Sequence, residues 1–435
     1  MKALVLMLLL LASQTYSTGQ SKPVSRKRAA AAAAGAARKL VDITITGQTK
    51  YQPKQILAAC GLEIGQKATE ETFKDAVRKL GETGLFSDVA YSYSFDAEGT
   101  KLQIQLSDNE KLVPVEFDNL VWYSKEELIA KIQAAIPLFQ GRVPSGGSMI
   151  DEIADVLSVL LAQKNPDLHL DYLRPSDPKQ PVVFSVSGTQ IQIHRVDFPG
   201  ASSSHLAALM EAGKKLQGSD YLHGAIADFV KSNLQPIYLR DGYLKAAFGE
   251  PSTRVVSESP DETMVDVSLP VEEGTQYTLG KLTFADNSVF PAEKLQSQIH
   301  LQAGAPVNLI QLRNDLETIR RLYGTRGYVK AALQLQPDFN DTGNTVAYQV
   351  AVHEGDVYRM GDVDLEGLDD KAAARMREEW SLREGEPYDS TYSQRFVKQA
   401  AAELSKDAQW SIAVSESVND KDKIVDVVLH FSKSQ

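Results

Sequence analysis

One octapeptide pattern occurs twice in this chain, and its recurrence constrains the fold more than any other feature. Glu273 to Gly280 and Glu354 to Gly361 both read Glu-Gly-x-x-Tyr-x-x-Gly, and they begin 81 residues apart. Alternating apolar residues precede each copy and resume after it, which is typical of β-strands that bury one face. Each copy is therefore interpreted as a turn between two strands, and its return predicts a chain built from repeats.

A recurring glycine sets the number of repeats. It separates two predicted helices in each repeat, and its successive copies are 76, 77, 86 and 81 residues apart. Around each copy the apolar spacing changes from that of a strand to that of a helix and back, in the order β-α-α-β-β. We therefore predict an α+β protein of five tandem β-α-α-β-β repeats. The glycines are Gly65, Gly141, Gly218, Gly304 and Gly385.

Capping residues support two of the predicted helix starts. Thr69 precedes a stretch in which Phe73, Ala76 and Leu80 share one helical face, and threonine is a good N-cap. Ser124 and Glu127 have the spacing of a capping box. Both positions agree with the proposed repeat boundaries.

The predicted chain begins with a signal peptide (1–19) and a linker (20–37). Lys2, an apolar run that ends at Ala12 and the small residues after it are typical of a secretory signal, and the run is too short to cross a bilayer. The linker is basic and then alanine-rich, so it is either a low-complexity tether or a basic anchor for anionic lipid or cell wall. The repeats are predicted at 38–110, 111–190, 191–275, 276–355 and 356–435.

The sequence holds no recognisable catalytic or metal-binding motif. A formal charge of −11 argues against a nucleic-acid partner, which requires a basic face. The single cysteine, Cys60, excludes a disulfide within the chain, and its apolar neighbours favour a core residue over a reactive thiol. The seven histidines lack metal-ligand spacing, and no nucleophile elbow, dinucleotide fingerprint or phosphate loop occurs. We predict no enzyme activity, no cofactor, no metal and no small-molecule substrate.

Two acidic residues nevertheless invite a general acid–base interpretation. Glu273 and Glu354 open the two copies of the octapeptide, so each lies at a predicted junction between repeats. Because the same position recurs, we favour a role in junction geometry over catalysis. The segment Ser145-Gly146-Gly147-Ser148 is likewise interpreted as a loop before a helix rather than as a mobile active-site loop.

The repeats resemble the polypeptide-transport-associated (POTRA) domain. The resemblance rests on β-α-α-β-β units of this length, on the Glu-Gly junctions, and on the Gly242-Tyr243 and Gly327-Tyr328 pairs before the second strand. Strings of five such domains precede the barrel of the surface-antigen family, whose members insert other proteins into the bacterial outer membrane. The resemblance implies an elongated array of domains, each a three-stranded sheet packed on two helices with the second strand at an edge. The sequence continues into no barrel, so we expect a POTRA-only protein and do not carry over the insertion activity.

An edge strand leaves main-chain groups unpaired, and an extended peptide can add to it. We predict one such partner-binding edge over 244–248 and a second over 329–335. The alternative is that these residues only fill the core of each domain. The predicted partner-binding residues are Leu244, Ala246, Phe248, Val329, Ala331 and Leu333.

The resulting prediction is an exported protein-binding scaffold in outer-membrane protein assembly or polypeptide transport. Its expected partner is an outer-membrane barrel protein or an unfolded outer-membrane polypeptide, and it is expected in the periplasm or associated with the outer membrane. A structural spacer that joins envelope components without chaperone activity is the main alternative. A cell-wall hydrolase is a third class, for which the sequence offers no motif.

Overall fold

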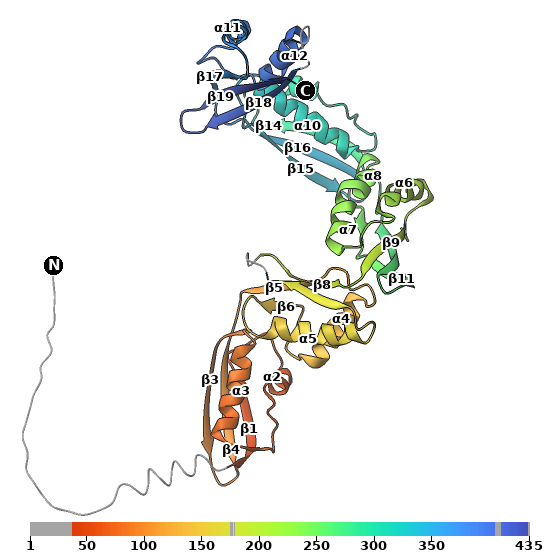
Figure 1. Cartoon of the computed structure of the whole chain (residues 1–435), viewed down its shortest axis with the longest axis vertical. Coiled ribbons are helices and arrows are strands. Elements are labelled where there is room, and N and C mark those ends of the chain that lie inside the picture. Colours follow the sequence, from red (N-terminus) through yellow and green to blue (C-terminus); the bar gives the residue numbers. More distant parts are fainter. Residues whose placement is uncertain (1–36, 175–176, 178, 405–409, 434–435) are drawn as a thin grey trace, which may run out of the picture. The chain divides into compact units, whose positions relative to one another are not determined.

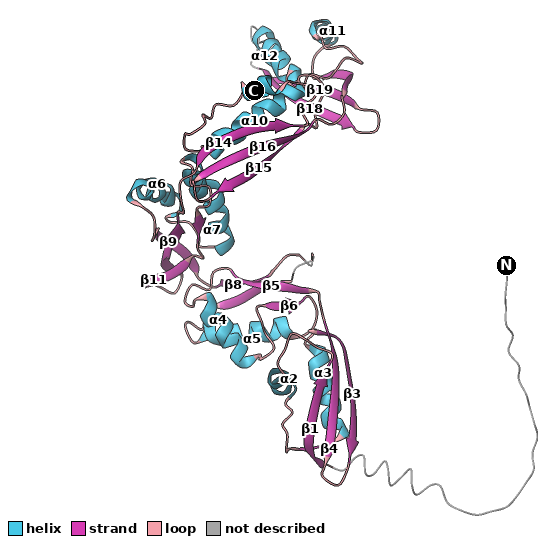
Figure 2. Cartoon of the chain, turned by 180° about the vertical axis from the view of Figure 1, so that it is seen from behind, coloured by secondary structure: helices cyan, strands magenta, loops and turns pink. Residues whose placement is uncertain are grey.

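The computed structural model describes residues 37–174, 177, 179–404 and 410–433. The predicted signal peptide and all but the last residue of the predicted linker lie outside the described residues. The described residues fall into two compact units, one that ends at Gln190 and one that begins at Ile191. This division coincides with the predicted boundary between the second and third repeats, and each unit is described by itself (Figures 1 and 2).

The first unit holds two domains with the same order of elements. In the first domain, Thr69 caps its helix as predicted, because its side chain accepts a hydrogen bond from the Thr72 N–H, and Phe73, Ala76 and Leu80 are buried. The elements of the first domain are β1 (Arg38–Thr46), α2 (Pro53–Cys60), β2 (Lys67–Ala68), α3 (Glu70–Glu82), β3 (Phe86–Phe95) and β4 (Thr100–Asp108). Those of the second are β5 (Leu112–Phe117), α4 (Lys125–Ala135), β6 (Arg142–Pro144), α5 (Met149–Ala162), β7 (His169–Leu173) and β8 (Val182–Ser187).

The two domains of the first unit share one continuous core. Buried side chains of both belong to a single hydrophobic cluster. The Ser148 N–H also donates to the Glu82 carbonyl at 2.9 Å, and the Gln55 side chain donates to the Pro137 carbonyl at 3.0 Å. Ser148, at the end of the predicted loop, therefore precedes a helix and helps to join the domains.

The third domain opens the second unit and departs from the predicted strand pattern. Its second helical segment is interrupted by a π-helical turn, which precedes Pro236 at the start of α8. Its elements are β9 (Gln190–Asp197), α6 (Ser203–Gly213), η1 (Lys214–Leu216), α7 (His223–Phe229), η2 (Val230–Leu234), α8 (Gln235–Arg240), β10 (Ala247–Phe248), β11 (Ser252–Glu258), β12 (Glu262–Ser268) and β13 (Val271–Glu272).

The fourth and fifth domains follow the predicted order closely. Figure 1 shows the long helix α10 lying along the sheet of its own domain. The elements of the fourth domain are β14 (Thr278–Ala285), α9 (Ala292–Gln296), α10 (Leu309–Gly324), β15 (Ala332–Asn340) and β16 (Thr345–His353). Those of the fifth are β17 (Arg359–Glu366), α11 (Asp370–Glu379), α12 (Tyr392–Leu404), β18 (Trp410–Asn419) and β19 (Ile424–Lys433).

The sheets confirm the α+β fold class and the expected position of the second main strand. In each domain the last main strand lies in the centre, between the first strand and the second. Short strands extend the first two sheets, so those have four strands rather than the predicted three. The second main strand lies at an edge of every sheet in the described part of the chain, and these edge strands are β3, β7, β11, β15 and β18.

The recurring glycine has one structural role in most domains. The N–H groups of Gly65, Gly218, Gly304 and Gly385 donate to a carbonyl of the first strand at 2.7–2.8 Å. All four have positive φ, between 76° and 99°, which an L-residue with a side chain rarely adopts. The near-constant spacing in the sequence therefore reflects one backbone contact that returns in each domain.

We predict that Gly304→Ala destabilises the fourth domain by about 1 kcal/mol, the usual cost of a left-handed residue with a Cβ. The added Cβ at Gly304 meets no atom within 4 Å, so the cost comes from the backbone alone. Native-state hydrogen exchange of the β16 amides measures it. Gly280→Ala is the control, because its φ is not positive and its nearest neighbour lies at 3.5 Å. Equal protection in both variants would contradict the prediction.

Candidate functional site

The first predicted binding edge, residues 244–248, does not form an edge strand, so this prediction is wrong. Leu244 and Ala246 lie in turns, and Phe248 belongs to the two-residue strand β10, which pairs with β13. Ala246 is buried, and Leu244 packs against the core of the fourth domain. The edge of the third sheet is instead β11. The apolar alternation at 244–248 thus arises from a turn that leads into a two-residue strand and not from an edge strand.

The second predicted edge is partly correct. Val329 and Ala331 precede the strand, with Ala331 buried and Val329 packed against the core of the fifth domain. Leu333 lies in β15, which is an edge strand as predicted. Of the six predicted residues, Leu244 and Leu333 line one groove beside β15.

The two Gly-Tyr pairs belong to a longer repeated turn at the junctions between domains. Gly242-Tyr243-Leu244-Lys245-Ala246 and Gly327-Tyr328-Val329-Lys330-Ala331 share the pattern Gly-Tyr-x-Lys-Ala. The Gly242 and Gly327 carbonyls each accept, at 2.8 Å, the N–H of the next octapeptide's tyrosine. A Cβ on either glycine would meet that tyrosine's carbonyl oxygen at 2.7 or 2.6 Å, so only glycine fits.

The lysine and the tyrosine of each junction meet on one aspartate of the following domain. Lys245 Nζ lies 2.6 Å from Asp341 Oδ1, and the Tyr277 hydroxyl donates to the same oxygen at 2.7 Å. In the next junction, Lys330 pairs with Asp420, to which Tyr358 donates at 2.7 Å. We call each Lys–Tyr–Asp set a junction latch. The aspartates lie in the turns of the β15–β16 and β18–β19 hairpins.

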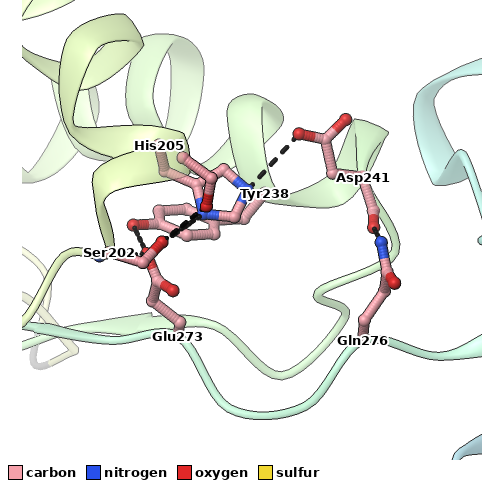
Figure 3. Close-up of polar contacts among 7 residues, drawn as sticks. Ser202, His205, Tyr238, Asp241, Glu273 and Gln276 are labelled. Atoms are coloured by element: carbon pink, nitrogen blue, oxygen red, sulfur yellow. Dashed lines mark hydrogen bonds and ion pairs between the residues drawn. The ribbon is translucent and has the colours of Figure 1, made fainter.

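The glutamates of the octapeptides close the preceding domain. Figure 3 shows the Glu273 carboxylate with Ser202, His205 and Tyr238 around it. Glu273 accepts hydrogen bonds from the Ser202 N–H at 2.9 Å and hydroxyl at 3.0 Å, and from the Tyr238 hydroxyl at 2.8 Å. His205 Nδ1 also lies 3.0 Å from it. The carboxylate thus joins the start of α6 to the last helix of the third domain.

Glu354 repeats this arrangement one domain later. It accepts from the Ser288 N–H at 2.7 Å, the Val289 N–H at 2.8 Å and the Tyr323 hydroxyl at 3.0 Å. Both carboxylates bind donors of their own domain. This agrees with the predicted role in junction geometry.

The serine, histidine and glutamate of the third domain do not form a catalytic triad. A triad histidine contacts its nucleophile and its carboxylate through opposite ring nitrogens. Here Ser202 Oγ lies 3.2 Å from His205 Nδ1, the same nitrogen that contacts Glu273. The other nitrogen, Nε2, lies 3.4 Å from Asp241 (Figure 3). The buried histidine therefore serves as a polar link inside the domain.

The hydrogen bonds also shift the acidity of these carboxyl groups. Burial by itself raises the pKa of Glu354, but hydrogen bonds from Ser288, Val289 and Tyr323 outweigh it and lower the pKa below its usual value. A lowered folded-state pKa means that the ionised carboxylate stabilises the fold above the unfolded-state pKa. This stabilisation is lost as the pH falls through the folded-state pKa.

We therefore expect Glu354→Gln to destabilise the fourth domain at neutral pH by about 1 kcal/mol, the scale of a lost charge-assisted hydrogen bond in a partly exposed site. The difference from the wild type should shrink as the pH falls below about 4. Hydrogen exchange at several pH values measures this. Asp338→Asn, at an exposed carboxylate on β15 of the same domain, is the control variant.

The junction latch can be tested separately. Asp341→Ala removes the acceptor of both Lys245 and Tyr277, so we expect a broader distribution of distances between spin labels on α6 and α10. Asp338→Ala is the control, because this residue is exposed on the same hairpin and outside the latch. Unchanged distributions in Asp341→Ala would show that the latch does not hold the third and fourth domains together.

A groove of about 480 Å³ lies between α10 and the edge strand β15. Leu309, Arg313 and Leu316 contribute to its helical wall. Alternate residues of the strand form the other wall, namely Leu333, Leu335, Pro337 and Phe339. The groove is thus mainly apolar along the strand and carries charge along the helix.

The main-chain groups of these alternate residues point away from the sheet. The Thr278 N–H donates to the Asn344 carbonyl, so even-numbered residues of this segment face β14. Odd-numbered residues of β16 therefore face β15, where they pair with even-numbered residues without a register shift. Odd-numbered residues of β15 face outward. Pro337 fits this position, because an edge strand tolerates proline where the missing N–H would face solvent.

Neither metal binding nor membrane crossing is indicated for the described residues. Within them, no group of three or more His, Cys, Asp or Glu side chains is placed to hold a metal ion. Cys60, interpreted from the sequence as a core residue, is buried and unpaired with another cysteine. The described helices include none with the length and apolar character that a membrane span requires.

The fourth domain matches a known family. A family model described as "Surface antigen variable number repeat", POTRA, matches residues 277–355. The chain is 21% identical over 208 residues to a putative outer membrane protein assembly factor of Treponema pallidum, which covers 46% of this chain and 25% of the relative. It is 21% identical over 328 residues to the outer membrane protein assembly factor BamA of Buchnera aphidicola, and this match covers 70% of this chain and 50% of the relative.

Solved structures include similar domains. The crystal structure of POTRA domains 3–5 of Haemophilus influenzae BamA covers 56% of this chain and 96% of its own, with 21% identity and a TM-score of 0.42. The match to POTRA domains 1–3 of the periplasmic domain of Omp85 from Anabaena covers 57% of this chain and 98% of that structure, with 15% identity and a TM-score of 0.28. The chain spans between a quarter and a half of the length of the two curated relatives. Their names describe assembly factors and not enzymes, in agreement with the prediction of no enzyme activity.

Proposed function

We propose that this chain, whose domains are POTRA domains like those of BamA and Omp85, is an exported protein-binding scaffold that takes part in outer-membrane protein assembly or polypeptide transport. Its proposed location is the periplasm or the periplasmic surface of the outer membrane. Its proposed partner is an unfolded outer-membrane polypeptide or a barrel protein. The partner adds a strand to the β15 edge, and this edge with its groove is the observation that carries the proposal.

The main chain of β15 offers an incomplete ladder to such a strand. Leu333, Leu335 and Phe339 each present an outward N–H and C=O, and Pro337 presents a C=O alone. A strand that adds here exchanges main-chain hydrogen bonds with these groups. Because the bonds involve no side chain, they tolerate many partner sequences. This tolerance suits a protein that handles many unfolded chains.

The groove supplies the second half of the binding site. Side chains of an added strand that face the same side as Leu333 and Leu335 lie over α10, where Leu309 and Leu316 contribute apolar surface. A strand with apolar residues at every second position buries them there. Strands of membrane barrels have this alternation, because one face meets lipid. The groove therefore fits the proposed client in its hydrophobic pattern as well as in its extended form.

We predict that Leu335→Pro weakens binding of an extended client peptide by about tenfold, because it removes an outward donor and leaves one peptide carbonyl unpaired. The β15–β16 ladder keeps its hydrogen bonds, since Leu335 does not bond to β16. The probes are dye-labelled peptides of ten residues copied from transmembrane strands of barrel proteins. Fluorescence anisotropy gives their Kd.

Val414→Pro is the matched control for this experiment. Val414 lies in the edge strand β18, and its main chain faces outward, because the Arg359 N–H donates to the Lys423 carbonyl and fixes the alternation of β19. Both variants must retain the wild-type circular dichroism spectrum. Equal loss in both, or no loss in Leu335→Pro, would remove β15 as the docking edge.

The structural spacer is the second candidate, and the junction latches favour it. Two Lys–Tyr–Asp sets hold the third, fourth and fifth domains together, as a spacer of defined length requires. A spacer would bind none of the client peptides and would yield one defined partner on crosslinking in the cell envelope. Binding of several unrelated client peptides would exclude this candidate.

A further inference from the structure

One cationic side chain of the groove beside β15 lacks an acidic partner. Arg320 is paired with Glu317 through two hydrogen bonds of 2.8 and 2.6 Å, and Lys245, near the end of the strand, is paired with Asp341. Arg313 lines the same groove and is exposed. It forms no ion pair with any residue that the structure describes. Its charge is therefore available to a ligand.

The sequence spacing suggests Glu317 as an ion-pair partner for Arg313, but in the structure Glu317 bonds to Arg320. Glu317 lies four residues after it on α10, the usual distance for a helical ion pair. Both oxygens of Glu317 accept from Arg320, and Arg321 Nε also lies 3.6 Å from one of them. Two arginines, Arg320 and Arg321, thus share the Glu317 carboxylate, and Arg313 is a third arginine on this face of the helix. The local charge is positive, although the whole chain carries −11.

The position of Arg313 along the groove can be read from its neighbours. It lines the groove together with Pro337 and Tyr348, which form one rung of the β15–β16 ladder. Lys245 lies over the Phe339 ring at 4.6 Å, and Tyr277 bonds both to Gly242 and to the Val307 N–H just before α10, so α10 begins and β15 ends at the same end of the groove. Because a helix rises about 1.5 Å and a strand about 3.3 Å per residue, Arg313 lies beside the Pro337–Tyr348 rung.

An added strand presents one particular side chain to this rung. Residues directly opposite each other in neighbouring antiparallel strands point to the same side of the sheet. The side chain of Pro337 faces the groove, so the client residue opposite it faces the groove as well. The client residues two positions before and after it lie opposite Leu335 and Phe339, where the wall is apolar.

We propose that this groove selects extended segments that carry an acidic residue opposite Pro337, with apolar residues two positions away on both sides. The acidic side chain pairs with Arg313, and its apolar neighbours pack over Leu335 and Phe339. This inference rests on the proposed strand addition at β15. It adds a preference of charge to a site whose main-chain contacts are indifferent to sequence.

The test is a double-mutant cycle between the full chain and synthetic peptides. Three ten-residue peptides carry alternating Leu, Val and Phe on one face and differ only in a central residue of that face, which is Glu, Gln or Lys. Kd is measured by fluorescence anisotropy at low salt and in 0.5 M NaCl. The wild type should bind the Glu peptide about fivefold more tightly than the Gln peptide at low salt, and the Lys peptide least.

Two variants of the chain assign this preference to one residue. Arg313→Gln should bind the Glu and Gln peptides equally, and it should bind the Gln peptide as the wild type does. Arg321→Gln makes the same change of charge on the same helix, outside the residues that line the groove, and should keep the preference. Loss of the preference in both variants would indicate a diffuse field and overturn the assignment to Arg313.

The outcomes separate this inference from the proposed function. Binding of all three peptides with equal Kd would overturn the charge preference and leave strand addition standing. Binding of none would overturn strand addition itself. A second copy of the chain in the groove is a further alternative, and it would appear in sedimentation as a dimer that Arg313→Gln dissociates. That result would overturn the proposal of a client segment.

Discussion

A half-buried carboxylate at the end of each of two domains holds three segments of the chain together. Glu273 and Glu354 each follow the last strand of a domain and accept hydrogen bonds from residues that precede its first helix and from a tyrosine of its last helix. Three or more donors compensate the cost of burying the charge. Because the glutamate is fixed, the tyrosine four residues later enters the next domain in a defined position. The junction latches depend on that position.

Most of the fold follows from features that are local in the sequence. The recurring glycines mark a backbone conformation and a contact with the first strand, so their spacing revealed the number of domains. Thr69 and Ser124 cap the helices that their positions indicated, because a capping contact spans only three residues. The fourth domain, where helix and strand periodicities are longest, agrees with the prediction and with the matched family.

The prediction failed in a turn at the junction between two domains. Leu244 and Ala246 alternate as residues of a strand do, yet Leu244 lies in a turn and packs on the core of the fourth domain, and Ala246 is buried before the strand begins. The strand begins only at Ser252, after Gly249 and Pro251, whereas β15 begins at Ala332, directly after the equivalent turn. The junction aspartates were also missed, because Tyr277 and Asp341 are 64 residues apart and no local pattern connects them. Only the fold brings them together.

The junction latch is attached to the turn of the β15–β16 hairpin, so it can transmit a mechanical load between the two domains. The strand that offers the free edge ends at Asn340, and the next residue, Asp341, is bound by Lys245 of the preceding domain. A polypeptide held along β15 and pulled parallel to the strand loads this hairpin at its tip. The tension then passes into the neighbouring domain through one exposed ion pair and one buried tyrosine. The fourth domain thus shares the load on its edge with the third, so traction on a bound chain is borne by a pair of domains.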